Sequence, residues 1–226
     1  DDQYRGCRDE MIKKMPALHH SEQQQNKNFS RVWAKATAAW HKKALTGSPL
    51  SPAQAIAIMA YTMEDVYGEF NTAVREAGSS SQEYRDNFHF KTLHFLLTDA
   101  LAVLRPAQQC QEVYRGVSEY QFKAQRGDTV RFGQFASTSR LQQVAETFGT
   151  ATMFRVNTCQ GVAIWNYSFD VSLQEVLIPP FETFEVTEIT QKGNTAEIRL
   201  RSKGTHSNYN CEWLRGDITG TTWGER

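Results

Sequence analysis

The spacing of apolar residues predicts helices in the first half of the chain. From about Gln23 to Ala44 they recur every three or four positions, on one face of an amphipathic helix. Ser51 before Pro52 is a helix start signal and predicts a second helix over Ala53–Tyr67. A wide apolar stripe of Phe and Leu predicts a third helix over Gln82–Leu104. We interpret these stripes as core-facing surfaces.

After Pro106 the pattern changes to short runs rich in β-branched and aromatic residues, separated by Gly, Asn and Asp. The predicted strands are Glu112–Val117, Thr129–Phe132, Thr152–Val156, Glu175–Ile178, Thr183–Thr190 and Ala196–Ser202. Ser139 and Gln142 have capping-box spacing and predict a short helix that ends near Phe148. Helices first and strands after predict an α+β fold with a mostly antiparallel sheet. We expect a single domain over residues 1–226, mainly helical over 1–105 and mainly β over 106–226.

Composition and charge exclude several classes of partner. The 25 basic and 25 acidic residues balance, so no global positive field would hold nucleic acid or an anionic membrane. No stretch approaches the roughly 20 apolar residues that span a bilayer, and the first residues lack a signal-peptide pattern. We expect a mature or trimmed soluble ectodomain that is monomeric.

The four cysteines lie far apart, with no CxxC and no His at zinc spacing, which argues against a metal site. Two disulfides are the alternative. Pairing Cys7 with Cys211 would join the chain ends, and pairing Cys110 with Cys159 would close an inner loop. Each would contribute at most about 4–5 kcal/mol by the chain-entropy model. An oxidising compartment would also suit glycosylation acceptor patterns at residues 28–30 and 166–168.

Three segments of the β part place a polar residue beside an apolar run. Arg115 and Gly116 lie in a predicted strand, where the Arg could be a solvated or ion-paired side chain or a fork for a pyrophosphate. Gly at the next position would let a ligand approach the backbone. The hydroxyls of residues 137–139 fit a turn with a helix cap or a binding loop, and Glu175 opens an apolar strand. No Ser-His-Asp or Cys-His arrangement is present.

Together these and other segments resemble the vertebrate ecto-mono-ADP-ribosyltransferases, a group whose Arg-Ser-Glu signature is shared with cholera-type toxins. The resemblance covers nearly the whole chain. It rests on Asp1–Cys7, Phe70–Ala77, Phe90–Thr98, Val113–Gly116, Val130–Ser139, Glu175–Glu182 and Asn208–Cys211, in that order. It implies an ADP-ribosyltransferase fold, in which an N-terminal helical region packs on a mostly antiparallel β-sandwich core with an NAD cleft. It also implies the pairing Cys7–Cys211 and Cys110–Cys159.

The resemblance further implies roles for single residues. Arg115 is similar to the signature Arg that holds the phosphate and ribose of NAD, and Ser137 to the first Ser of the Ser-x-Ser motif, which orients NAD. Phe148 is similar in position to the aromatic that packs on nicotinamide, and Glu175 to the catalytic Glu. Such a carboxylate would stabilise the oxocarbenium-like ribose formed as nicotinamide departs. The expected NAD-binding set is Arg115, Gly116, Ser137, Thr138, Ser139, Phe148 and Glu175.

The acceptor side departs from the family pattern. Arginine-modifying members carry a Glu-x-Glu pair whose first Glu engages the acceptor guanidinium, whereas this chain has Leu173, Gln174 and Glu175. Gln174 is neutral and cannot act as a base. The resemblance therefore predicts an NAD-dependent mono-ADP-ribosyltransferase with no metal, whose acceptor is an unknown protein or water. The alternatives are an NAD glycohydrolase and a catalytically weak surface binding protein, in each case secreted or lipid-anchored outside the cell.

Overall fold

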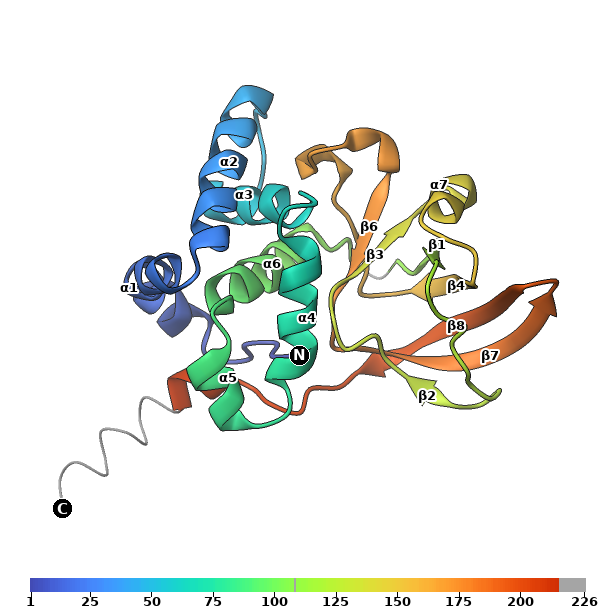
Figure 1. Cartoon of the computed structure of the whole chain (residues 1–226). Helices are drawn as coiled ribbons and strands as arrows, with labels where there is room; N and C mark the ends of the chain where they lie inside the picture. The colour runs from blue at the N-terminus through green and yellow to red at the C-terminus, as the bar shows by residue number, and fades with distance from the viewer. Residues whose placement is uncertain (108, 216–226) are drawn as a thin grey trace, which may run out of the picture. The chain divides into compact units, whose positions relative to one another are not determined.

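The computed structural model describes residues 1–107 and 109–215, which divide into two compact units (Figure 1). The helical unit comprises Asp1–Ala100 and residues 207–215, and the β unit comprises Leu101–His206. The predicted boundary between the helical and β parts, at 105–106, lies close to the first change of unit. Residues 207–215 were predicted with the β part but cluster with the helical unit. That the two units form one domain remains a prediction.

The helical unit contains more helices than the apolar spacing predicts. They are α1 (Arg8–Gln25), α2 (Lys27–Lys43), α3 (Pro52–Tyr61), α4 (Tyr67–Ala77), α5 (Ser81–Asn87) and α6 (Lys91–Leu104), whose last residues pass the unit boundary. The helix predicted from Gln23 is two helices, because Asn26 ends α1 and its side chain caps α2 by accepting from the Phe29 N–H at 3.0 Å. The helix predicted over Gln82–Leu104 is interrupted where Phe88 takes an extended conformation.

The start of α3 follows the sequence signal. The Ser51 side chain accepts from the Gln54 N–H and the Gln54 side chain accepts from the Ser51 N–H, which makes a capping box with Pro52 in the first turn. Every residue of α3 from Gln54 to Tyr61 is buried, so this helix forms the centre of the helical unit. The helix ends at Tyr61, earlier than predicted.

A buried glutamate from α1 supplies the N-terminal cap of α6. The two carboxylate oxygens of Glu22 accept from the backbone N–H groups of Lys91 at 2.7 Å and Thr92 at 2.8 Å. The first N–H groups of a helix have no partner inside the helix, and a carboxylate there also matches the helix dipole. Burial raises the pKa of the Glu22 carboxyl, and the Thr92 side chain, the two backbone hydrogen bonds and the charge of Lys91 oppose the rise.

The β unit is built on one sheet of eight strands, in the order β2-β7-β8-β4-β1-β3-β6-β5. The strands are β1 (Gln111–Val117), β2 (Thr129–Val130), β3 (Ala136–Ser139), β4 (Thr152–Thr158), β5 (Val162–Ala163), β6 (Glu175–Ile178), β7 (Glu182–Lys192) and β8 (Thr195–Thr205). Neighbours pair antiparallel, apart from the parallel pair of β4 and β8. The mostly antiparallel sheet predicted from the sequence is therefore confirmed.

One apolar cluster takes side chains from strands far apart in this order. It includes Val176 from β6 and Phe184 from β7, together with Val113, Val156 and Ile198 from the strands between them. Since β6 and β7 lie near opposite ends of the strand order, the sheet curves around this cluster. The curvature gives the sandwich-like core that the resemblance implies.

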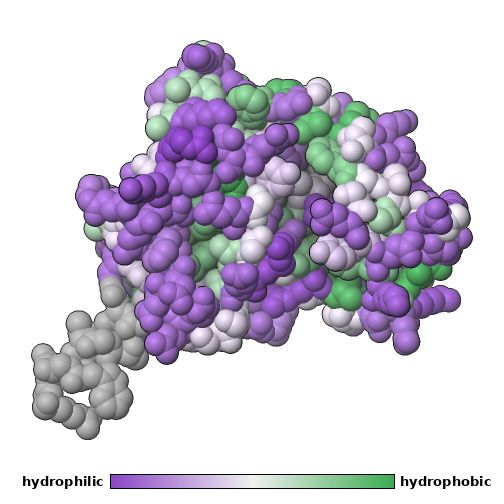
Figure 2. Space-filling view, viewed as in Figure 1, coloured by the Kyte–Doolittle hydropathy of each residue, from purple (hydrophilic) through white to green (hydrophobic). Residues whose placement is uncertain are grey.

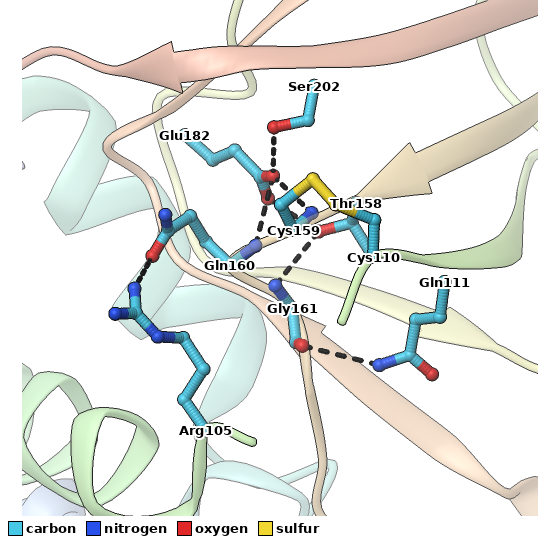
Figure 3. Close-up of a disulfide and its surroundings, with 9 residues drawn as sticks. All are labelled: Arg105, Cys110, Gln111, Thr158, Cys159, Gln160, Gly161, Glu182 and Ser202. Atoms are coloured by element: carbon cyan, nitrogen blue, oxygen red, sulfur yellow. Dashed lines mark hydrogen bonds between the residues drawn. A yellow bond between two sulfur atoms is a disulfide. The ribbon is translucent and has the colours of Figure 1, made fainter. Parts of the chain in front are cut away.

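Both expected disulfides are present. Cys7 pairs with Cys211 within the helical unit, across 204 residues, and Cys110 pairs with Cys159 within the β unit, across 49 residues. The second bridge joins the segment before β1 to the end of β4 (Figure 3). Stable disulfides are typical of extracellular proteins, so the pairing supports an extracellular location.

Beside this second bridge, Glu182 is completely buried (Figure 3). Its carboxylate accepts from the hydroxyls of Thr158 at 2.5 Å and Ser202 at 2.8 Å. It also accepts from the backbone N–H groups of Cys159 at 2.7 Å and Gln160 at 3.1 Å. Burial raises the pKa of Glu182 although all four hydrogen bonds lower it. The carboxylate thus closes the turn after β4.

Among residues 1–107 and 109–215, no helix combines the length and apolar character needed to cross a membrane.

Candidate active site

The signature residues lie on three neighbouring strands of the β unit. β3 lies between β1 and β6, with Tyr114 of β1 opposite Ser139 of β3, and Ser139 opposite Glu175 of β6. Side chains alternate between the two faces of a strand, so Ser137 and Ser139 share one face of β3 and Thr138 lies on the other. The pairing brings Arg115, Ser137 and Glu175 into one small region of the sheet.

Arg115 is held by the middle strand and by an aromatic ring. Its Nη1 donates to the Ser137 carbonyl oxygen at 2.9 Å, across from β1 to β3. The guanidinium also lies 5.9 Å from the centre of the Phe132 ring, within cation–π range. These contacts orient the planar guanidinium group of Arg115 beside Glu175. A guanidinium in such a place can bind a phosphate with two parallel hydrogen bonds.

Glu175 is the buried carboxylate of this group, with 8% of its surface exposed. Burial raises the pKa of its carboxyl, while a hydrogen bond with the Ser137 side chain and the positive charge of Arg115 lower the pKa. Ser137 and Arg115 therefore both act on the Glu175 carboxyl. A carboxylate in this low-dielectric position can stabilise positive charge that develops on a bound substrate.

The loop before Glu175 is held in a conformation that few residues adopt. Gln174 has φ 42° and ψ 51°, the left-handed region that is uncommon for a residue with a side chain. The Ser139 hydroxyl fixes this loop, since it donates to the Leu173 carbonyl at 2.8 Å and accepts from the Leu141 N–H at 3.0 Å. Leu173 is half-buried and Gln174 is exposed. The acceptor-side positions therefore directly precede the buried carboxylate.

A short helix packs against β1 next to Arg115. The helix α7 (Gln142–Thr147) contacts β1 closely, because a Cβ atom at Gly116 would lie 2.2 Å from the Ala145 carbonyl oxygen and 2.3 Å from that of Gly149. Gly116 is thus needed for helix packing, a reason different from the ligand approach expected from the sequence. Phe148 ends α7 between these two contacts and is 56% exposed. Its ring is available to stack on a ligand.

Two expectations about residues 137–139 need correction. The segment is strand β3, not a turn with a helix cap, and Ser139 does not form a capping box with Gln142. The cap position of α7 is Leu141, which has no side-chain cap. Thr138 is buried with its hydroxyl donating to the Val176 carbonyl at 2.6 Å, so its side chain holds β6. The NAD contacts expected of Thr138 and Ser139 remain predictions.

The sequence did not single out several side chains around the site. Phe132, under the Arg115 guanidinium, lies in a segment that the resemblance quotes, but no role was assigned to it. The Arg140 guanidinium lies 5.3 Å from the centre of the Trp165 ring, between the ends of β3 and β5. No local pattern marks either pair, because Phe132 lies 17 residues from Arg115 and Trp165 lies 25 residues from Arg140 in the sequence.

Apolar side chains are exposed on the loop that leads to β6. The loop contains the short helices η1 (Trp165–Tyr167) and η2 (Val171–Leu173). Phe169 and Val171 are both about half exposed. In Figure 2 hydrophobic surface is seen in the region of this loop, orange in Figure 1, amid a mostly hydrophilic face. An exposed apolar loop at a sheet edge can contact a partner.

Comparison with known proteins assigns the family. A family described as NAD:arginine ADP-ribosyltransferase matches residues 1–208. The chain belongs to this family. It is 48% identical over 229 residues to NAD(P)(+)–arginine ADP-ribosyltransferase 2 of Gallus gallus, covering 99% of this chain and 73% of the relative. It is 45% identical to GPI-linked NAD(P)(+)–arginine ADP-ribosyltransferase 1 of Mus musculus, covering 95% of this chain and 71% of the relative.

Solved structures of this family have the same fold. The eukaryotic mono-ADP-ribosyltransferase ART2.2 matches with TM-score 0.81 and 35% identity, over 93% of this chain and 94% of that chain. An ART2.2 variant solved in complex with NAD matches with TM-score 0.80 and 33% identity, over the same shares of the two chains. The ADP-ribosyltransferase fold expected from the sequence is therefore confirmed.

The family is described by NAD as its substrate. Within the described part of the chain, no three His, Cys, Asp or Glu side chains are grouped so that they could hold a metal ion.

Proposed function

We propose that this chain cleaves the bond between nicotinamide and ribose in NAD and transfers the ADP-ribose to an acceptor, as a mono-ADP-ribosyltransferase. The observation that carries the proposal is the convergence of Arg115, Ser137 and Glu175 on three adjacent strands. Membership of the ADP-ribosyltransferase family and the NAD complex of the relative ART2.2 support the same conclusion.

Each side chain has a physical role in this reaction. The Arg115 fork binds the pyrophosphate, and the exposed Phe148 ring packs on the nicotinamide. Nicotinamide leaves with the electrons of the broken bond, so positive charge develops on the ribose. The Glu175 carboxylate accepts a hydrogen bond from the neighbouring 2′-hydroxyl and stabilises that charge. Ser137 keeps Glu175 oriented and ionised through its hydrogen bond. The acceptor then attacks the ribose and loses a proton.

We propose that Leu173 weakens transfer to arginine. The relatives named above are arginine ADP-ribosyltransferases by name. Leu173 offers no carboxylate to a guanidinium, and the exposed Gln174 beside it is neutral. The nearest other carboxylate of the loop, Asp170, accepts from the N–H and the hydroxyl of Ser172. Water or a different protein side chain is then the more effective acceptor, which makes NAD glycohydrolase activity the second candidate function.

The experiment uses labelled NAD with and without a small guanidino acceptor. Nicotinamide release measures bond cleavage, and label on the acceptor, on protein or in free ADP-ribose separates transfer from hydrolysis. We expect nicotinamide release from the parent protein with its disulfides intact. The absence of any release would contradict the proposal and favour a surface binding protein.

The variant Leu173→Glu tests the acceptor assignment. It should raise transfer to the guanidino acceptor by about tenfold or more, the effect of about 1.4 kcal/mol of attraction between carboxylate and guanidinium. Leu173→Gln is the matched control, since it adds polarity without charge and should leave transfer unchanged. Equal transfer by the parent, Leu173→Glu and Leu173→Gln would show that acceptor choice is set elsewhere.

A further inference from the structure

Two asparagines of the chain match the acceptor pattern for N-linked glycosylation, Asn-x-Ser/Thr, and the catalytic proposal uses neither. Asn28 lies in α2 of the helical unit, and Asn166 lies in η1 of the β unit. An extracellular chain passes through the oxidising compartment in which disulfides form and N-linked glycans are attached. The structure distinguishes the two asparagines by their exposure and by the elements that carry them.

The side chain of Asn28 is part of the packing between α2 and the start of α4. It is half-buried, and its Nδ2 donates to the Asp65 carbonyl oxygen at 3.0 Å and to Glu69 Oε2 at 2.6 Å. Its Oδ1 accepts from Arg31 at 2.7 Å. An amide nitrogen carries two hydrogens, and both are used here. A sugar on this nitrogen would replace one of them and break a contact to α4 or to the segment before it, so the helical unit disfavours a glycan at Asn28.

Asn166 is the exposed middle residue of a turn whose following residues are buried. Tyr167 is 8% exposed and Ser168 is 1% exposed. The Tyr167 N–H and the Ser168 hydroxyl both donate to the Ile164 carbonyl oxygen, each at 2.9 Å. These contacts fix the turn and leave Asn166 at its surface. A sugar attached there would extend into solvent, as is typical of acceptor asparagines in surface loops.

The burial of Ser168 determines when a glycan could be attached. The transferase recognises the hydroxyl of the acceptor pattern together with the asparagine, and in the folded loop the Ser168 hydroxyl is inaccessible. Attachment must therefore precede folding of the loop, as it does when a chain is modified on entry into the secretory pathway. The hydroxyl is afterwards free to close the turn, so its burial is compatible with a glycan at Asn166.

We propose that Asn166 carries an N-linked glycan and that Asn28 does not. The donor is a lipid-linked oligosaccharide diphosphate. The Asn166 Nδ2 attacks C1 of the first sugar, so that a bond between Nδ2 and C1 forms and the bond between C1 and the diphosphate oxygen breaks. The lipid diphosphate leaves with the bonding electrons, and the amide gives up one proton.

The surroundings of Asn166 support a glycan at this place. Phe169 is 58% exposed and Val171 is 47% exposed on the same loop, orange in Figure 1. Exposed apolar side chains close together favour association between molecules, and a bulky hydrophilic group beside them opposes it. The loop also reaches the catalytic carboxylate, because the Ile164 N–H donates to the Glu175 carbonyl oxygen at 3.0 Å.

The test uses the full chain secreted from cultured animal cells. Peptide-N-glycosidase removes an N-linked glycan and converts the asparagine that carried it to aspartate, which takes up heavy oxygen when the reaction is run in heavy-oxygen water. Mass spectrometry of the peptides should find this label at residue 166 and not at residue 28. The treatment should also increase the mobility of the parent chain in a denaturing gel.

The variants Asn166→Gln and Asn28→Gln form a matched pair. Asn166→Gln should migrate like the glycosidase-treated parent and lose the mobility shift, whereas Asn28→Gln should keep the whole shift. Absence of label at residue 166 of the secreted parent would overturn the inference, as would label at residue 28. A mobility shift that persists in Asn166→Gln would have the same meaning. The peptide mapping needs only the parent chain, so a variant that is not secreted leaves the test decisive.

Discussion

The helical unit and the β unit each bury a glutamate, but the partners of the two carboxylates differ. Glu22 is 2% exposed and Glu175 is 8% exposed. Glu22 is bound by two backbone N–H groups at the start of α6, which have no other partner in the helix, and the Thr92 side chain and the charge of Lys91 also act on it. The Glu175 carboxyl interacts with two side chains, the hydroxyl of Ser137 and the charge of Arg115. Burial, a hydroxyl and a nearby positive charge are thus common to both carboxylates, and the pair of backbone donors distinguishes Glu22.

The difference has a chemical consequence. The backbone donors belong to the first turn of a helix and are fixed by it. They therefore hold a carboxylate in one place and favour stability. Side-chain partners on neighbouring strands can exchange a hydrogen bond for one to a substrate. Burial raises the pKa of both carboxyls, so each group is costly to ionise in the fold. At Glu22 the positive end of the helix dipole stabilises the ionised carboxylate. At Glu175 the ionised carboxylate can stabilise positive charge that develops on the substrate.

The substitution Glu175→Gln should have the largest effect. We expect nicotinamide release to fall about 10²–10³-fold, because the amide cannot stabilise the charge on the ribose. The free energy of unfolding at neutral pH should not fall. A carboxyl whose pKa is raised in the fold adds stability only at low pH and loses it as the pH rises through the folded pKa. Activity assays and urea unfolding check both parts. Parental activity in this variant would refute the site assignment.

The same change in the helical unit, Glu22→Gln, should give the opposite pattern. The new amide NH₂ would face one of the backbone N–H groups of α6 and leave it without an acceptor. An unsatisfied buried donor costs about 1–3 kcal/mol, so the free energy of unfolding should fall by that amount. Nicotinamide release per folded molecule should stay near the parental value. A large loss of activity without loss of stability would remove the contrast between the two glutamates.

Ser137→Ala should have the smallest effect, on the pH dependence of the reaction. Cleavage needs ionised Glu175, so the rate should rise with pH through the raised pKa of that carboxyl. The Ser137 hydrogen bond lowers this pKa, and its removal should move the acid limb of the pH–rate profile to higher pH. The profile of nicotinamide release measures the shift. An acid limb that is unmoved, or moved to lower pH, would separate Ser137 from Glu175.

The site residues were expected from the family resemblance, and the strand pattern by itself predicted only part of their setting. The strand Glu175–Ile178 has its predicted bounds, and the pairing of both disulfides is confirmed. The segment Ala136–Ser139 was missed because three hydroxyl residues in a four-residue strand have no apolar alternation. The helix α1 was missed because it is polar on nearly every side, with Met11 and Glu22 as its buried residues.

Other features depend on pairing between distant segments. The capping box expected at Ser139 failed because Ser139 belongs to β3 and α7 begins only at Gln142, with Leu141 at the cap position. The Ser139 hydroxyl instead donates to the Leu173 carbonyl, 34 residues away. The role of Gly116 follows from the approach of the Ala145 and Gly149 carbonyls, which no local pattern indicates. The start of the predicted helix at Gln23 was wrong because Asn26 ends α1 and caps α2, which begins at Lys27. The contacts of Ser139 and Gly116 join segments that are brought together only in the folded chain.

The most direct test of the active-site assignment is a crystal structure of Glu175→Gln with NAD. We expect the ribose 2′-hydroxyl of the nicotinamide half within hydrogen-bond distance of the residue-175 side chain, the pyrophosphate on Arg115 and the nicotinamide against Phe148. NAD bound at a surface away from β1, β3 and β6 would contradict the account, as would a nicotinamide ribose that does not contact residue 175.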